Sequence, residues 1–192
     1  MRLRLENCES PLSRLLLVTD DDGALRALDF ADHEPRMRRL LHDHYGDFVL
    51  EKGAAPKSIL RALDAYFDGN LSALDSVRIA TGGTPFQRAV WKALRAITPA
   101  TTKSYGQLAR VLGRPKASRA VGAANGANPI AIVVPCHRVI GSNGALIGYG
   151  GGLPRKQWLL DHERLHAIAE LAELGSQVSV GHLPMRSQLA FN

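Results

Sequence analysis

The sequence predicts an α+β fold, in which an N-terminal antiparallel sheet with helices is followed by a mostly helical C-terminal domain containing a helix-turn-helix. Three observations predict this class. Short apolar or alternating runs separated by turn residues fill the first third of the chain, as is typical of strands. Apolar residues at helical spacing follow them. Beyond the middle of the chain, two short helical segments are joined by a glycine turn.

Residues 1–80 are expected to form the first domain. Ser10-Pro11 and the run from Asp20 to Gly23 mark turns between its strands. In chain order, the expected elements are strands at 2–5, 14–18 and 24–30 and helices at 34–45 and 58–67.

Residues 81–166 are expected to form the second domain. Thr84 is a suitable N-cap and Pro85 suits the first position of a helix. Ser104 is expected to cap the next helix, which closes at Gly113. The expected elements are helices at about 85–96, 104–113 and 116–127, a buried strand or extended segment at 130–134, and a closing helix at 154–164.

Charge divides the chain into two halves. No aspartate or glutamate lies between Asp75 and Asp161. Residues 84–166 hold 12 Lys and Arg against 2 Asp and Glu, whereas residues 1–83 hold 11 against 14. A basic surface free of carboxylates is what polyanion binding requires. A basic surface that only aids solubility is the alternative, but the asymmetry favours nucleic acid.

Composition excludes several classes. With 45% hydrophobic residues the chain can bury a core, and its apolar runs at 15–18 and 130–134 are too short to span a bilayer. The N-terminus has no apolar signal core, and two cysteines, Cys8 and Cys136, cannot form a disulfide framework. We therefore expect a cytoplasmic protein with no membrane partner. Residues 167–192 form a tail to which no role is assigned.

Metal ligands are expected to be absent. The candidates in the N-terminal part are Cys8, His33, His42 and His44, and their spacing is not that of a metal site. His42 and His44 lie two residues apart, so they would face different sides of a helix. We expect neither a metal nor a cofactor.

Cys136 is the candidate nucleophile. It lies in Pro135-Cys136-His137-Arg138-Val139, and cationic neighbours stabilise a thiolate, which predicts a lowered pKa of about 3.5–7.5. Adjacent residues of an extended strand point to opposite faces, so Cys136 and His137 share a site only if the chain turns at Pro135 or a water links them. The alternative is a buried cysteine that acts as a small hydrophobe.

The segment 118–127 is a helix of small residues with one long basic side chain, Arg119. A helix that reads the major groove needs several long polar side chains, which this segment lacks. Small residues allow a close approach to a narrow groove while Arg119 reaches into the base stack. Tight packing between helices would favour the same small residues and is the alternative.

These motifs together resemble the O6-alkylguanine-DNA alkyltransferases, also called methylated-DNA–protein-cysteine methyltransferases, of the bacterial stand-alone type. The resemblance covers roughly residues 80–165. The segments that carry it are 83–87, 90–91, 104–109, 119–122, 128–140, 148–149, 151–152, 158–160 and 162–163, and more loosely 66–71.

The resemblance implies catalytic roles for five residues. Cys136 would accept the alkyl group in a single displacement. His137 would carry the thiol proton away through a water, and Glu163 would orient His137. Asn128 would brace the turn before the active-site segment, and Tyr105 would polarise the departing guanine and help to rotate the nucleotide. Without the resemblance, Glu163 would be a surface carboxylate and Tyr105 a half-buried helix residue.

The resemblance also implies binding residues. Val139, Tyr149 and Gly150 would line the pocket for the base. Some relatives have serine where this chain has Gly150, so a roomier pocket is expected. The residues expected to contact DNA are Arg119, in the gap in the base stack, and Gln87, Gly106, Arg114 and Ser142, on the backbone.

The implied function is direct repair of alkylated double-stranded DNA. The base would be flipped out of the duplex, and the alkyl group of O6-alkylguanine, and of O4-alkylthymine, would pass irreversibly to Cys136. A monomer in solution is expected, and cooperative assembly on DNA is left open. One alternative is a non-catalytic reader of alkylated DNA, but such proteins replace the cysteine that is present here. The other is a cysteine hydrolase, which gives no reason for the Arg119 helix.

Overall fold

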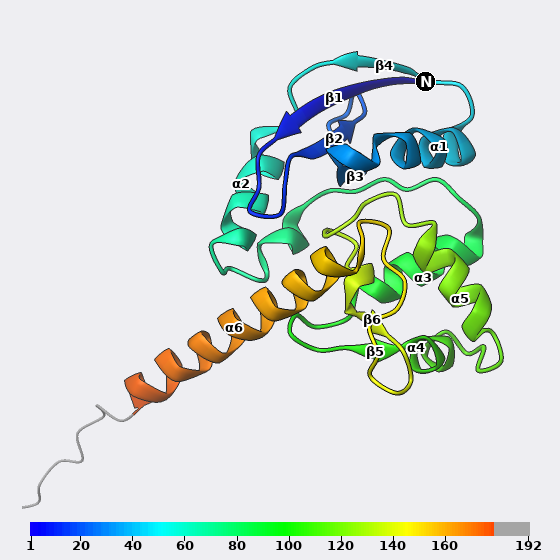
Figure 1. The fold of residues 1–192 in the computed structure, drawn as a ribbon. Coiled ribbons are helices and arrows are strands. Elements are labelled where there is room, and N and C mark those ends of the chain that lie inside the picture. Colours follow the sequence, from blue (N-terminus) through cyan, green and yellow to red (C-terminus); the bar gives the residue numbers. More distant parts are fainter. Residues whose placement is uncertain (179–192) are drawn as a thin grey trace, which may run out of the picture.

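The structure, a computed structural model, describes residues 1–178. A sheet and two helices from the N-terminal part pack against a group of helices from the C-terminal part (Figure 1). A long last helix starts between the two parts and extends away from both (Figure 1). The α+β class is confirmed.

The sheet consists of β1 (Arg2–Cys8), β2 (Leu15–Thr19), β3 (Leu25–Phe30) and β4 (Val49–Lys52), in the order β3-β2-β1-β4. The first three strands are antiparallel, but β4 pairs parallel to β1, so the purely antiparallel sheet predicted is wrong. This edge strand escaped prediction because it is short and largely exposed, with no apolar alternation. The helix α1 (Glu34–Tyr45) supplies the crossover that a parallel pair needs.

Strand β2 is buried along its whole length and divides two cores. Leu16 and Val18 pack with Met37 of α1 on one face. Leu15 and Leu17 point to the other face, into a large cluster that includes residues of both halves of the chain. Because side chains alternate across a strand, one strand holds both layers together. The N-terminal part therefore shares its core with the part that carries Cys136.

The other N-terminal elements are α2 (Lys57–Phe67) and the short 3-10 helices η1 (Ala31–His33) and η2 (Ala73–Ser76). The C-terminal part contains α3 (Pro85–Arg95), α4 (Tyr105–Val111), α5 (Ser118–Gly126), η3 (Cys136–Arg138) and α6 (Leu153–Val178). Two short strands, β5 (Lys103–Ser104) and β6 (Val139–Ile140), pair in parallel. Thr84 and Ser104 cap α3 and α4 through complete capping boxes, as predicted.

The segment 130–134 is buried, but it pairs with the sheet through a single isolated β-bridge and does not form a strand. Its first residue, Ile130, pairs with Leu28 of β3, after which the chain turns at Ile132, whose φ is 66°. Backbone hydrogen bonds of Leu28 with Pro129 (3.0 Å) and Ala131 (2.8 Å) fasten this segment to the sheet. The turn directs the chain toward Cys136.

Helix α6 continues well beyond the predicted end near residue 164. Part of the expected tail at 167–192 is thus helical, and residues 179–192 lie outside the described part. The extension exposes Ile168 and Leu171, at 60% and 69%, so packing contributes little to its helical state. The sequence here is rich in Ala, Leu and Glu, which favour helix on their own. In the part of the chain that is described, no helix has the length and apolarity to cross a membrane.

Candidate active site

Cys136 opens the 3-10 turn η3 directly after Pro135, and 4% of its surface is exposed. Burial raises the pKa of its thiol, although the Asn128 amide, Arg36 and Lys156 act to lower it. The lowered pKa expected from the sequence is therefore wrong for the resting protein. The sequence suggested cationic neighbours in His137 and Arg138, but the cations that act on the thiol are Arg36 and Lys156. The loss of water around the sulfur likewise depends on the whole fold.

His137 and Glu163 are brought together in the interior. Nε2 of His137 lies 2.9 Å from Oε1 of Glu163, and neither side chain is exposed. Burial lowers the pKa of His137, while the hydrogen bond and charge of Glu163 raise it in part, so the ring is neutral at neutral pH. Its Nδ1 is buried and has no hydrogen-bond partner among the described residues. An imidazole held at one nitrogen with the other free is suited to accept a proton.

Glu163 is held by more than His137. Arg138 donates from Nη2 to Oε1 at 2.8 Å, the Tyr66 hydroxyl donates to Oε1 at 2.9 Å, and the Ala100 amide donates to Oε2 at 3.0 Å. Burial acts to raise the pKa of Glu163, but His137 and Arg138 lower it well below its usual range. The carboxylate is therefore ionised, with its charge balanced by Arg138. Sequence reasoning missed all three added partners, although Arg138 stands in the cysteine motif.

Asn128 closes the turn between α5 and the buried segment. Its Nδ2 donates to the carbonyl of Val134 at 2.8 Å, and its Oδ1 accepts from the amide of Ile130 at 3.0 Å. The side chain is buried and so replaces water for both backbone groups. The position of Cys136 therefore depends on this turn.

Arg36, which the sequence did not suggest, joins α1 to the same turn. Its Nη1 donates to Oδ2 of Asp29 at 2.5 Å, and its Nη2 donates to the carbonyls of Gly126 at 3.1 Å and Asn128 at 3.2 Å. Asp29 is buried at the end of β3. No local pattern could identify this contact, because it joins segments about ninety residues apart.

Val139, Tyr149 and Gly150 are the residues predicted to line the pocket for the base. Val139 is buried, and the ring of Tyr149 meets that of His137 edge-on, with centroids 6.4 Å apart. The Tyr149 hydroxyl is buried without a partner in the described part of the chain. The space beside Gly150 is filled by the guanidinium of Arg36, so the roomier pocket expected from this glycine is wrong.

Lys156 is a further buried residue that the sequence did not single out. Its Nζ donates to the carbonyls of Val139 at 2.5 Å and Ile147 at 2.7 Å, which ties α6 to two segments around the pocket. Burial lowers the pKa of this lysine to about 8. Tyr105 lies nearby, and its hydroxyl donates to the carbonyl of Ile147 at 3.3 Å.

The residues expected to contact DNA lie away from the buried network, on α3, α4, the turn between α4 and α5, α5 and the loop after β6. Arg119 and Ser142 are exposed, and the exposed Arg114 lies over the ring of Phe86. Gln87 is partly engaged, because its Oε1 accepts from the amide of Thr84 in the capping box. Gly106 lies in the first turn of α4. A shallow hollow of about 290 Å³ brings Ser142 beside α4 and is lined with Thr102, Ser104, Gln107 and Arg110.

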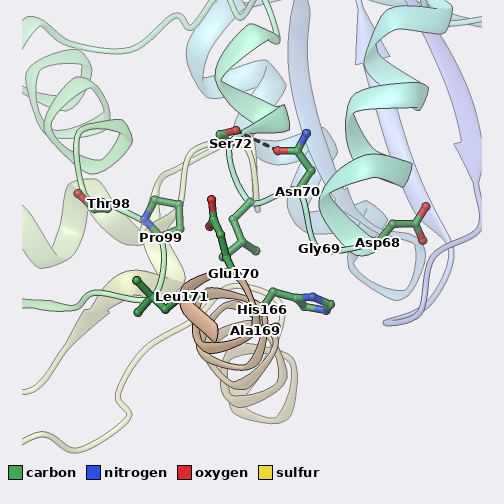
Figure 2. A pocket seen from close by; sticks show the side chains of 12 residues that line it. Asp68, Gly69, Asn70, Ser72, Thr98, Pro99, His166, Ala169, Glu170 and Leu171 are labelled. Carbon is green, nitrogen blue, oxygen red and sulfur yellow. Dashed lines mark hydrogen bonds between the residues drawn. The ribbon is translucent and has the colours of Figure 1, made fainter. Parts of the chain in front are cut away.

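A separate cavity of about 660 Å³ lies where α6 passes the 68–72 and 98–99 segments. Figure 2 shows Glu170 rising from α6 between Pro99 and Asn70. None of the predicted site residues lines this cavity. This cavity is therefore separate from the residues around Cys136.

A buried cysteine next to a buried histidine–carboxylate pair, with exposed arginines on the C-terminal part, is consistent with a thiol-dependent protein that binds nucleic acid. The family described as 6-O-methylguanine DNA methyltransferase, DNA binding domain, matches residues 85–165. A methylated-DNA–protein-cysteine methyltransferase of Salmonella typhimurium is 54% identical over 165 residues, which cover 85% of this chain and 96% of the relative. One of Methanosarcina acetivorans is 44% identical over 155 residues, which cover 81% and 94%.

Solved structures agree with the sequence relatives. The Mycobacterium tuberculosis O6-methylguanine methyltransferase is 40% identical with a TM-score of 0.73, and the match covers 90% of this chain and 99% of that one. The M. tuberculosis OGT in complex with DNA is 39% identical with a TM-score of 0.71, over 86% and 94%. This chain belongs to the methylated-DNA–protein-cysteine methyltransferase family, and its activity is that of a DNA-repair transferase.

Proposed function

We propose that this protein flips O6-alkylguanine, and O4-alkylthymine, out of double-stranded DNA and transfers the alkyl group once, irreversibly, to Cys136. The observation that carries the proposal is the state of His137. Glu163 holds its Nε2 at 2.9 Å, and its buried Nδ1 has no partner among the described residues. This nitrogen is a base with no other assigned use, next in sequence to the thiol.

The proton would pass from Cys136 to His137 through one water. A carboxylate accepts hydrogen bonds only, so Nε2 of His137 carries the hydrogen and Nδ1 keeps its lone pair. Because burial raises the pKa of Cys136, the thiolate forms as the alkylated base arrives and not beforehand. Glu163 then stabilises the imidazolium through its negative charge.

The transfer step would be a single displacement at the alkyl carbon. The bond from sulfur to carbon forms as the bond from carbon to O6 breaks, and the electron pair stays on the guanine, which takes up one proton. The Tyr105 hydroxyl polarises the departing base. The product is a thioether, which neither water nor a second thiol displaces readily, so each molecule acts once.

Base flipping follows from the burial of the thiol. A sulfur that is 4% exposed reaches an alkyl group only if the base leaves the duplex, at a cost of a few kcal/mol. Arg119 on α5 would take the place of the base in the stack, and the small residues of that helix permit its close approach. Val139, Tyr149 and Gly150 would enclose the flipped base. Gln87, Gly106, Arg114 and Ser142 would hold the DNA backbone.

The proposal is tested by incubating the protein with duplex DNA that carries radiolabelled O6-methylguanine, followed by denaturing electrophoresis and peptide mapping. Label on the peptide that contains Cys136, at up to one equivalent per protein, is the expected result. Retention of the DNA without label would favour a non-catalytic reader instead. Label that appears on another peptide would overturn the assignment of Cys136.

A further inference from the structure

Arg36 occupies the place that a side chain at position 150 would need. A Cβ built on Gly150 would lie 2.4 Å from Cζ and from Nη2 of Arg36, whereas such atoms essentially never approach within 3.0 Å. The backbone of Gly150 is not in the left-handed region, so alanine would fit there without strain of its own. A side chain at position 150 would therefore clash with Arg36 and not strain the backbone.

Moving the guanidinium away from Gly150 would cost free energy, although it is the end of a flexible side chain. It is 17% exposed and is paired with Asp29, which is 1% exposed. Its second nitrogen donates to the carbonyls of Gly126 and Asn128. Displacing it would leave a buried carboxylate without its charged partner, which is strongly unfavourable.

Three structures that serve different purposes meet at this guanidinium. Gly126 is the last residue of α5, the proposed DNA-contacting helix. Asn128 holds the turn that leads to Cys136. Gly150 belongs to the loop proposed to enclose the flipped base. Arg36 comes from α1, which belongs to the N-terminal part.

We propose that Arg36 is a positioning residue for alkyl transfer, which clamps the end of α5 and the pocket loop in register, and that position 150 must be glycine to admit it. The N-terminal part thereby contributes to the reaction without touching the substrate. This inference rests on the proposed role of Cys136. Small displacements of reacting groups slow reactions severely, so a clamp that fixes two sides of a pocket affects the rate.

A double-mutant cycle tests the pairing. Gly150→Ala and Arg36→Lys each change one partner, and lysine keeps the charge opposite Asp29 while losing the planar fork. The rate of reaction with free O6-benzylguanine is measured for the wild type, both single variants and the double variant. We expect each single variant to react about tenfold more slowly, and the double variant to be slowed by about the same factor rather than a hundredfold.

Arg38→Lys is the matched control, because Arg38 lies on the same helix and makes an exposed pair with Glu34. It should react at the wild-type rate. Thermal midpoints are measured in parallel, and a role in stability alone would move them without a non-additive change in rate. If the double variant does not fold, Gly150→Ala is compared with Gly150→Ser, and the larger residue should slow the reaction more.

Two outcomes would overturn the inference, namely additive losses in the cycle and an unchanged rate in both single variants. Equal rates for alanine and serine at position 150 would do the same. A wild type that transfers no label would refute the proposed function instead, so the two failures are distinguishable.

Discussion

The two cysteines, Cys8 and Cys136, differ in both burial and the charges around them, Cys8 being half-buried and Cys136 buried. Burial raises the pKa of both thiols. Around Cys8 the carboxylates of Asp64, Glu6 and Glu9 raise it further, to about 11. Around Cys136 an amide and two cations lower its pKa in part, although the carboxylate of Asp29 acts to raise it. Burial alone would make both sulfurs inert, and the charges placed around each one decide which can become a nucleophile.

The largest expected difference between the two cysteines is in transfer itself. Cys136→Ser should abolish transfer, because a hydroxyl is far less acidic than a thiol, while DNA binding stays nearly intact. Cys8→Ser is the matched control and should transfer at the wild-type rate. Transfer is measured with labelled alkylated duplex and binding by gel shift. Residual transfer by the first variant together with a loss in the second would reverse the assignment.

Glu163→Gln should slow transfer by about 10²-fold, because a neutral amide cannot stabilise the charged form of His137. The pH dependence of stability tests separately whether Glu163 is charged in the folded protein. The pKa of Glu163 in the folded protein lies well below its ordinary 4.5, so the carboxylate stabilises the fold above pH 4.5 and loses that effect as the pH falls below it.

Urea unfolding at a series of pH values measures this effect. The variant should be less stable than the wild type by about 3 kcal/mol at pH 7, and the difference should shrink below pH 4.5. A difference that stays constant down to pH 3 would mean that the charge of Glu163 does not act in the fold. The reactivity of Cys8 toward iodoacetamide should be equal in both proteins.

Arg119→Ala should slow repair of duplex DNA by about tenfold and leave the reaction with free alkylguanine unchanged, because a free base needs no extrusion. The ratio of the two rates is the measurement. Equal losses on both substrates would place Arg119 in support of the pocket or the fold. Iodoacetamide labelling of Cys8, which lies in β1, provides the internal reference for a folded protein.

Alkylation of Cys136 should have the smallest effect, a loss of about 1–3 kcal/mol from overpacking of a closed site. A benzyl group should destabilise the protein more than a methyl group and lower its affinity for DNA, because the site adjoins the Asn128 turn beside α5. Thermal unfolding of the free, methylated and benzylated proteins measures this. Three equal midpoints would show that the pocket accommodates either group without strain.

Local patterns were sufficient for most elements of the fold. The N-cap residues Thr84 and Ser104, the turn at Gly113 and the spacing of apolar residues placed α3, α4 and α5 correctly. These features act over a few residues, so the sequence carries them directly. The parallel strand β4 was missed because its order depends on pairing with β1, and not on its own residues.

The sequence by itself determined the motif around Cys136, the basic half of the chain and the family to which it belongs. Only the tertiary structure decided the direction of the pKa shift of Cys136 and the presence of Arg36, Tyr66 and Lys156 around the site. The physical reason is that desolvation and buried hydrogen bonds depend on every segment that packs against a group, and those segments come from distant parts of the chain.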